Sequence, residues 1–183
     1  MIEIKGLSLK LGDKQIFSDY SVSIPDRGVV MISGESGIGK TTFLRILCGL
    51  QKPDSGKISG LENRKISIVF QEPRLLNHLT ALENVSIVSD RDTAHQILCN
   101  LNMENELYMK AGKLSGGQTQ RVSLARAYAF SDDVVLLDEP FSGLDEQNKL
   151  KAARLICSAK LAIVVSHDAS DAEMLSINEI IRL

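Results

Sequence analysis

One stretch of the sequence decides the fold: GVVMISGESGIGKTTFLRIL, at residues 28–47. Residues 28–33 form a short apolar run that is typical of a buried strand. The glycine-rich run GESGIGKT at 34–41 follows directly, and a helix is predicted over about 40–50, because Phe43, Leu47 and Leu50 recur at helical spacing. A strand, a glycine-rich loop and a helix in this order are the context that a phosphate-binding loop (P-loop) requires.

The backbone of this loop is suited to phosphate. Its glycines let the chain curl so that N–H groups converge on phosphate oxygens, and the helix N-terminus adds a favourable dipole. Lys40 supplies a positive charge for the β- and γ-phosphates, and the Thr41 hydroxyl is placed to bind Mg²⁺. A glycine-rich turn without a ligand is the alternative, which the flanking strand and helix disfavour. The predicted nucleotide-binding residues here are Gly34, Glu35, Ser36, Gly37, Ile38, Gly39, Lys40, Thr41 and Thr42.

A second chemical feature is the run VVLLDE at 134–139. Its apolar part predicts a buried strand, and two carboxylates emerge where the strand ends, which is where open α/β sheets bind ligands. Asp138 is expected to hold Mg²⁺, and Glu139 to polarise the attacking water. A strand followed by an ordinary acidic turn is the alternative, and the P-loop upstream favours the catalytic interpretation.

The run LSGGQ at 114–118 suggests a second anion site. Ser115 is a good N-cap for the helix predicted over 116–129, and two glycines there leave backbone N–H groups approachable. An ordinary capped helix start would explain the serine but not the paired glycines.

Short apolar runs alternate with helical patterns along the chain, which favours an α/β protein. A hairpin is predicted with its turn at Gly12 and Asp13, and a helical pattern extends over 79–113. The remaining expectations are strands at 2–11, 15–24, 56–59, 65–70, 134–137, 161–166 and 177–183.

Composition excludes several classes of protein. The chain has 183 residues and a net charge of −2, whereas a nucleic-acid-binding protein usually needs a basic face. We find no run of about 18 apolar residues and no signal-peptide core, so a cytoplasmic protein is expected. The three cysteines lie far apart in sequence and are expected to be buried thiols.

At 114–127, LSGGQTQRVSLARA resembles the signature motif of the ATP-binding cassette (ABC) ATPases. Further runs are similar to that family's motifs in the family's order: GESGIGKTT at 34–42 (Walker A), VFQEP at 69–73 (Q-loop), VVLLDEP at 134–140 (Walker B), SGLD at 142–145 (D-loop) and VVSHD at 164–168 (switch histidine). The resemblance covers nearly the whole chain.

The resemblance implies a single nucleotide-binding domain over 1–183. Its fold would be a P-loop NTPase core with a small antiparallel β subdomain and an α-helical signature subdomain inserted at about 74–130. The segment 56–69 is short for the family, and a regulatory C-terminal domain is not expected after the switch histidine, so this would be a near-minimal cassette.

The resemblance also implies hydrolysis of ATP with Mg²⁺ between two cassettes packed head to tail, either two copies or a copy and a homologue. Lys40, Glu139 and His167 would be catalytic, and Gln71 would contact Mg²⁺ together with Thr41 and Asp138. The partner's γ-phosphate would be held in trans by Ser115, Gly116 and Gly117. Gln118 and Asp145 would belong to the same trans site, and Asp145 would join the two sites through the dimer interface.

The adenine site departs from the family's pattern. Leu11 stands near the position where the family usually has an aromatic residue stacked on the base. We expect Leu11 to cover the ring as an apolar surface, with Phe17 and Tyr20 as alternatives.

The expected function is to energise transport by a membrane permease supplied as a separate chain, at the cytoplasmic face of the membrane. Leu75 and Leu76 follow the Q-loop and would form the groove where the permease docks. The alternatives are a soluble ABC ATPase of a non-transport assembly and a dimerisation module with negligible turnover. Intact Glu139 and His167 argue against the dimerisation module.

Overall fold

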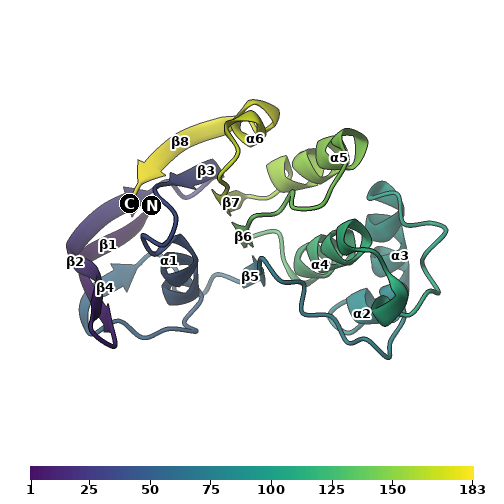
Figure 1. Cartoon of the computed structure of the whole chain (residues 1–183), viewed down its shortest axis with the longest axis horizontal. Coiled ribbons are helices and arrows are strands. Elements are labelled where there is room, and N and C mark those ends of the chain that lie inside the picture. The colour runs from purple at the N-terminus through teal and green to yellow at the C-terminus, as the bar shows by residue number, and fades with distance from the viewer.

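A computed structural model describes residues 1–183, apart from the side chains of Ala169 and Ser170. Its centre is a five-stranded sheet with the order β5-β6-β7-β3-β8, in which every neighbouring pair is parallel (Figure 1). Since the strands are parallel, their carboxyl ends lie at one edge of the sheet. The strands are β3 (Gly28–Ser33), β5 (Ile66–Val69), β6 (Val134–Asp138), β7 (Leu161–Val165) and β8 (Ile177–Arg182).

Both faces of this sheet are covered, as parallel sheets require. Alternate residues of β6 belong to different cores. Val135 and Leu137 pack in a core with helices α4 (Gly116–Phe130) and α5 (Glu146–Cys157). Val134 and Leu136 pack in the opposite core with helix α1 (Lys40–Leu47).

A smaller antiparallel sheet packs against α1 and has the order β2-β1-β4. Its strands are β1 (Ile2–Leu11), β2 (Lys14–Ile24) and β4 (Ser55–Ser59). Gly56 allows β4 to approach β1: its φ is +106°, and a Cβ there would lie 2.8 Å from the Gly6 carbonyl oxygen. No L-residue with a side chain fits that position without moving the backbone.

The helical lobe lies at the far end of the molecule from the small sheet (Figure 1). It contains α2 (Ala81–Ser86), α3 (Arg91–Asn100), the short 3₁₀ turn Ala111–Lys113 and α4. The buried Arg121 guanidinium on α4 donates to the carbonyl oxygens of Leu101 and Asn102, at 2.8 and 2.6 Å. Helix α6 (Ala169–Met174) is not part of this lobe and lies between β7 and β8 in the chain.

The α/β fold class predicted from the sequence is confirmed, with small shifts in element boundaries. Helix α1 ends at Leu47 rather than near Leu50, because Gly49 has a φ of +75° and turns the chain out of the helix. The helical pattern over 79–113 is divided into α2, α3 and a 3₁₀ turn, since Thr80 and Asp90 each start a new helix as N-caps.

The expectation that the cysteines are buried is wrong. Cys157 is exposed, and Cys48 and Cys99 are only half-buried. They sit on or at the ends of helices, where sequence periodicity does not resolve the boundary of the buried face.

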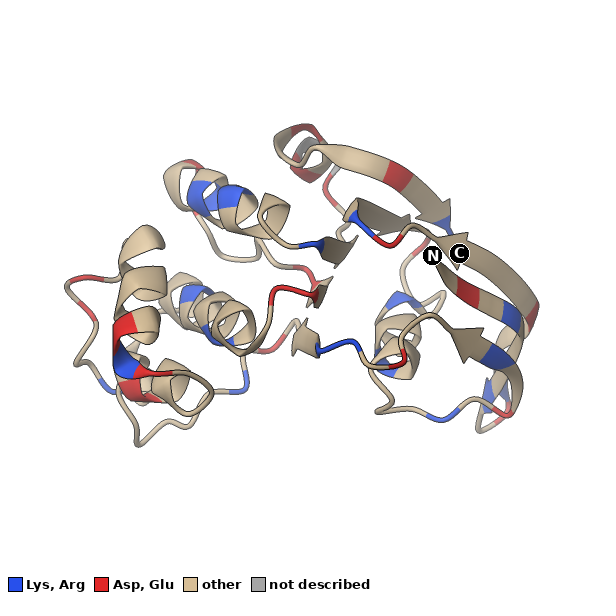
Figure 2. Ribbon diagram, turned by 180° about the vertical axis from the view of Figure 1, so that it is seen from behind, with Lys and Arg blue, Asp and Glu red and all other residues tan. Residues whose placement is uncertain are grey.

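Charged residues are distributed over the whole molecule. Figure 2 shows Lys and Arg interspersed with Asp and Glu on both lobes. Among the described residues, no helix is long and apolar enough to cross a membrane.

Candidate functional site

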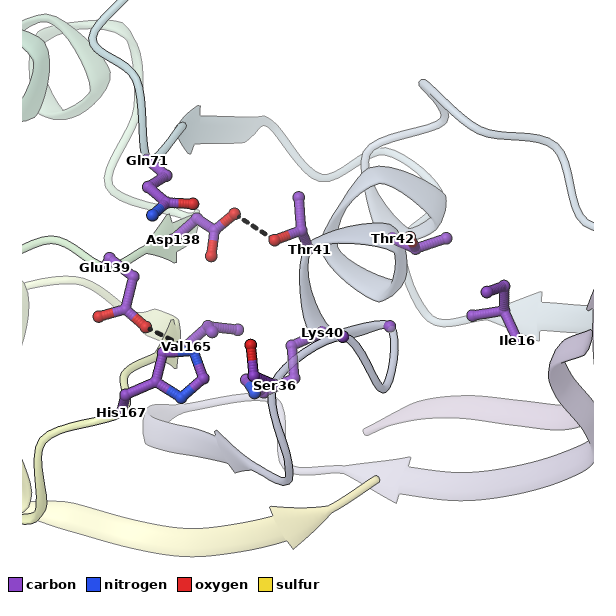
Figure 3. A pocket seen from close by; sticks show the side chains of 12 residues that line it. Ile16, Ser36, Lys40, Thr41, Thr42, Gln71, Asp138, Glu139, Val165 and His167 are labelled. Carbon is purple, nitrogen blue, oxygen red and sulfur yellow. Dashed lines mark hydrogen bonds and ion pairs between the residues drawn. The ribbon is translucent and has the colours of Figure 1, made fainter. Parts of the chain in front are cut away.

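A cavity of about 310 Å³ opens at the carboxyl ends of β3, β6 and β7 (Figure 3). Residues far apart in sequence meet there, because the parallel strands all end at this edge. From the P-loop come Ser36, Gly37, Gly39, Lys40, Thr41 and Thr42, and from elsewhere come Ile16, Gln71, Asp138, Glu139, Val165 and His167. Gly34, Glu35 and Ile38 belong to the same loop but are not in the cavity lining.

Lys40 is held inside the P-loop. Its ammonium group donates to the carbonyl oxygens of Gly34 and Glu35, at 2.8 and 2.9 Å, and the residue is 6% exposed. Gly39, just before it, has a φ of +120°, and a Cβ there would lie 2.6 Å from a methyl carbon of Ile16. The loop therefore needs glycine both for its dihedral angle and for its close packing on β2.

A hydrogen bond joins the P-loop helix to the end of β6. The Thr41 hydroxyl donates to the Asp138 carboxylate at 2.7 Å, and Gln71 points toward the same place (Figure 3). A hydroxyl, a carboxylate and an amide oxygen are hard ligands of the kind that Mg²⁺ accepts. Among the described residues there is no group of three His, Cys, Asp or Glu that could hold a metal alone.

Glu139 follows the end of β6 and lines the cavity. Its φ is +50°, a strained conformation for a residue with a side chain, and its backbone N–H donates to the Val165 carbonyl at 2.9 Å. Burial raises the pKa of the Glu139 carboxyl above its ordinary value, and His167 opposes that shift. A carboxylate with a raised pKa is a stronger base at neutral pH.

His167 is the neighbour of Glu139 across the cavity. Its Nε2 lies 3.5 Å from Glu139 Oε1, an ion-pair distance, and Oε1 has no hydrogen-bond partner among the described residues (Figure 3). The imidazole itself is 54% exposed at the mouth of the site. Both side chains therefore keep bonding capacity for a water and a phosphate.

The signature residues lie outside this cavity and have roles within their own chain. Ser115 and Gln118 form a capping box: the Ser115 hydroxyl accepts from the Gln118 N–H, and the Gln118 amide oxygen accepts from the Ser115 N–H. A Cβ on Gly117 would lie 2.4 Å from the Gly143 carbonyl oxygen, whereas a Cβ on Gly116 would meet nothing within 4 Å. Asp145 caps α5 by accepting from the Asn148 N–H.

The cavity lining includes Ile16 but not Leu11. Leu11 ends β1 and is 43% exposed, while Ile16 lies on β2 beside Gly39. Phe17 is buried against Phe43, with ring centroids 6.0 Å apart, so it is not available to stack on a base. Tyr20 is half-buried and lines a separate hollow of about 140 Å³ with Ile16 and Phe17. Sequence reasoning missed Ile16, although alternation along β2 places it on the face opposite to the buried Phe17.

Comparison with known proteins identifies similar chains. A family model described as "ABC transporter" matches residues 17–142. An aliphatic sulfonates import ATP-binding protein of Zymomonas mobilis is 39% identical over 96% of this chain and 79% of its own length. A sulfate/thiosulfate import ATP-binding protein of Salmonella typhi is 34% identical over 93% of this chain and 54% of its own. The dimeric structure of MJ0796, a bacterial ABC transporter cassette, superposes with a TM-score of 0.85 at 30% identity, covering 100% of this chain and 94% of that chain.

The positions of Ile16 and Leu11 give a testable difference. We expect Ile16→Ala to weaken ATP binding about 5- to 30-fold, roughly 1–2 kcal/mol, since the half-buried side chain loses contact of one to two CH₂ groups with the base at roughly 0.8 kcal/mol each. Leu11→Ala is the matched change on the neighbouring strand, and we expect it to cause a smaller loss of ATP affinity. Titration of each purified variant with ATP measures both affinities. A larger loss in Leu11→Ala than in Ile16→Ala would place the base over Leu11 instead.

Proposed function

Because the chain belongs to the ABC transporter family of ATP-binding proteins, we propose roles for its residues in a transport cycle. The chain is an ATP-binding and ATP-hydrolysing subunit that energises transport by a membrane permease supplied as a separate chain. The observation that carries the residue assignments is the meeting of Lys40, Thr41, Asp138, Glu139 and His167 in one cavity.

The P-loop residues bind the triphosphate. Lys40 and the loop N–H groups contact the β- and γ-phosphates, and Thr41, Asp138 and Gln71 hold Mg²⁺. Bound Mg²⁺ supplies positive charge that neutralises the phosphates as the γ-phosphoryl group is transferred. The donors already converge on this place, since Thr41 and Asp138 are hydrogen-bonded to each other.

Glu139 activates the water. Its carboxylate accepts a proton from the water as the water oxygen bonds to the γ-phosphorus, and the bond from that phosphorus to the β–γ bridging oxygen breaks to release ADP. His167 lies within 3.5 Å of Glu139 and holds the carboxylate and the γ-phosphate in line. The raised pKa of Glu139 suits it to this step.

We propose that two cassettes complete each site head to tail. The cavity of their own chain is not lined by Ser115, Gly116, Gly117, Gln118 or Asp145. The first three would hold the γ-phosphate of the partner's nucleotide, Gln118 would complete that trans site, and Asp145 would join the two sites through the interface. Gly116 is exposed, and a Cβ added there would meet nothing within 4 Å, so a group from outside can approach this residue. Solved relatives with this fold are dimeric cassettes, one of them described as bound to ADP and Pi.

The permease would dock beside the Q-loop, on the cytoplasmic face of the membrane. A hollow of about 230 Å³ is lined by Thr41, Gln71 and Asp138 from the catalytic site and by Arg45, Phe70, Glu72 and Arg74 at the surface. The Arg74 guanidinium lies 4.3 Å from the centre of the Phe70 ring. Leu76, two residues after Arg74, is 44% exposed, whereas Leu75 is half-buried and packs on the core. The relatives are import proteins with different cargoes, so we propose import and leave the choice of cargo to the permease.

Glu139→Gln tests the catalytic base. The amide keeps the shape of the side chain but cannot accept the proton, so hydrolysis should fall by about 10²- to 10⁴-fold while ATP binding persists. Phosphate release and nucleotide titration measure the two properties. Glu179→Gln, the same change at an exposed position, is the control and should hydrolyse normally. Normal turnover in Glu139→Gln would show that another group accepts the proton from the attacking water.

Mixing two inactive variants tests the head-to-tail site. Lys40→Ala removes the phosphate lysine, and Ser115→Arg blocks the signature, so each homodimer has only defective sites. After subunit exchange about half of the dimers are mixed, and each has one intact site of two, so roughly a quarter of wild-type sites should return. Activity of the mixture above the sum of the separate variants supports the assignment. No recovery, with exchange demonstrated by labelled subunits, contradicts it.

Leu76→Asp tests the docking surface. An exposed leucine beside the Q-loop has no evident packing role, so the charge should spare ATP hydrolysis of the isolated chain and abolish copurification with the permease. Leu150→Asp is the matched control, because Leu150 is similarly exposed on α5. Copurification of the permease with Leu76→Asp but not with Leu150→Asp would move the docking surface to α5.

A further inference from the structure

The residue before the switch histidine is fixed by a buried carboxylate. Ser166, 7% exposed, donates its hydroxyl to Asp171 Oδ2 at 2.6 Å and accepts from the Asp168 N–H at 3.1 Å. Asp171 is itself only 3% exposed. Because Ser166 adjoins His167 in the chain, these bonds set where the backbone of His167 leaves β7.

The other oxygen of this carboxylate is bound by a different element. Lys149, on α5, lies 3.3 Å from Asp171 Oδ1 and 3.7 Å from Asp168 Oδ2. Figure 2 shows α5 with its basic bands close to α6, where acidic residues lie. One lysine thus joins α5 to Asp168, which follows the switch histidine, and to Asp171 in the first turn of α6.

Stability alone does not account for such a pair. Removing charges from water is costly, and apolar residues of similar size often stabilise a fold as well or better. The pair also lines a hollow of about 300 Å³ that reaches Glu139 and the D-loop residues Ser142, Gly143 and Leu144. It therefore lies between the catalytic carboxylate and the start of α5.

We propose that Lys149 and Asp171 are positioning residues for ATP hydrolysis. Asp171 holds Ser166, and through it His167, at the distance from Glu139 that hydrolysis needs. Lys149 ties that arrangement to α5, whose N-cap is Asp145. This inference rests on the proposed ATPase function, because the placement of His167 against Glu139 affects turnover only if both residues act in hydrolysis.

The test compares two variants in which a basic residue of α5 is replaced by methionine, Lys149→Met and Arg154→Met. In Lys149→Met we expect unchanged ATP affinity and a decrease in kcat of roughly 10- to 100-fold, since a displacement of about 1 Å in an active site has this effect. Arg154→Met, on an exposed position of the same helix, is the control and should keep its kcat. Lys149→Arg keeps the charge and should restore most of the turnover.

A second variant isolates the contact itself. Asp171→Asn preserves the shape and removes the charge, and it should lower kcat as Lys149→Met does. If the two residues act through one contact, the double variant should be no slower than the slower single variant. Additive losses would show that the pair does not act as a unit and would overturn the proposal.

A spectroscopic readout separates positioning from a general loss of stability. The chain has three histidines, His78, His95 and His167, so histidine-labelled protein gives three imidazole signals in NMR spectra. In Lys149→Met the His167 signal should shift while those of His78 and His95 stay in place. The inference would be overturned if Lys149→Met had the same kcat as an active wild type and its His167 signal did not move. The proposed ATPase function would remain in that case. A wild type that does not hydrolyse ATP would instead remove the proposed function.

Discussion

The hydrogen bond from Thr41 to Asp138 is the contact on which the site depends. Its atoms are 2.7 Å apart although the residues are separated by 97 positions in sequence. It ties the first turn of α1, and so the P-loop, to the end of β6, and so to Glu139 one residue on. Because β6 and β3 flank β7 in the parallel sheet, the switch histidine after β7 arrives between them. The sheet order therefore determines which side chains can meet.

Much of this arrangement could be predicted from the sequence, since its signals are local. A strand, glycines and a helix in the order of residues 28–47 require no knowledge of distant residues, and neither does an acidic strand end such as Asp138 and Glu139. What could not be predicted depends on packing between elements. The cavity lining includes Ile16 on β2 and not Leu11 at the end of β1, and Cys157 is exposed at the last position of α5.

Most residues of the signature segment have structural contacts within their own chain. Ser115 and Gln118 cap their own helix, and Gly117 must be glycine to pack on the D-loop Gly143. These contacts explain the residues as structure. Gly116 is different, because a side chain there would meet nothing. No contact with the described residues requires a glycine at this position, so the packing of the chain alone leaves room there for a larger side chain.

The buried charged side chains are also held by specific contacts. Among the described residues, the buried charged side chains are Lys40, Arg121, Asp138 and Asp171. Desolvation makes each of them costly unless it is bonded, and each is bonded: to loop carbonyls, to the carbonyls after α3, to Thr41, and to Ser166 and Lys149. Arg121 joins α4 to the loop after α3, and the other three stand around the carboxyl ends of β3, β6 and β7. At each of these positions, hydrogen bonds or ion pairs hold a charged group in one orientation, which apolar packing cannot do. Fixed orientation of charged groups affects the rate most where phosphate is transferred.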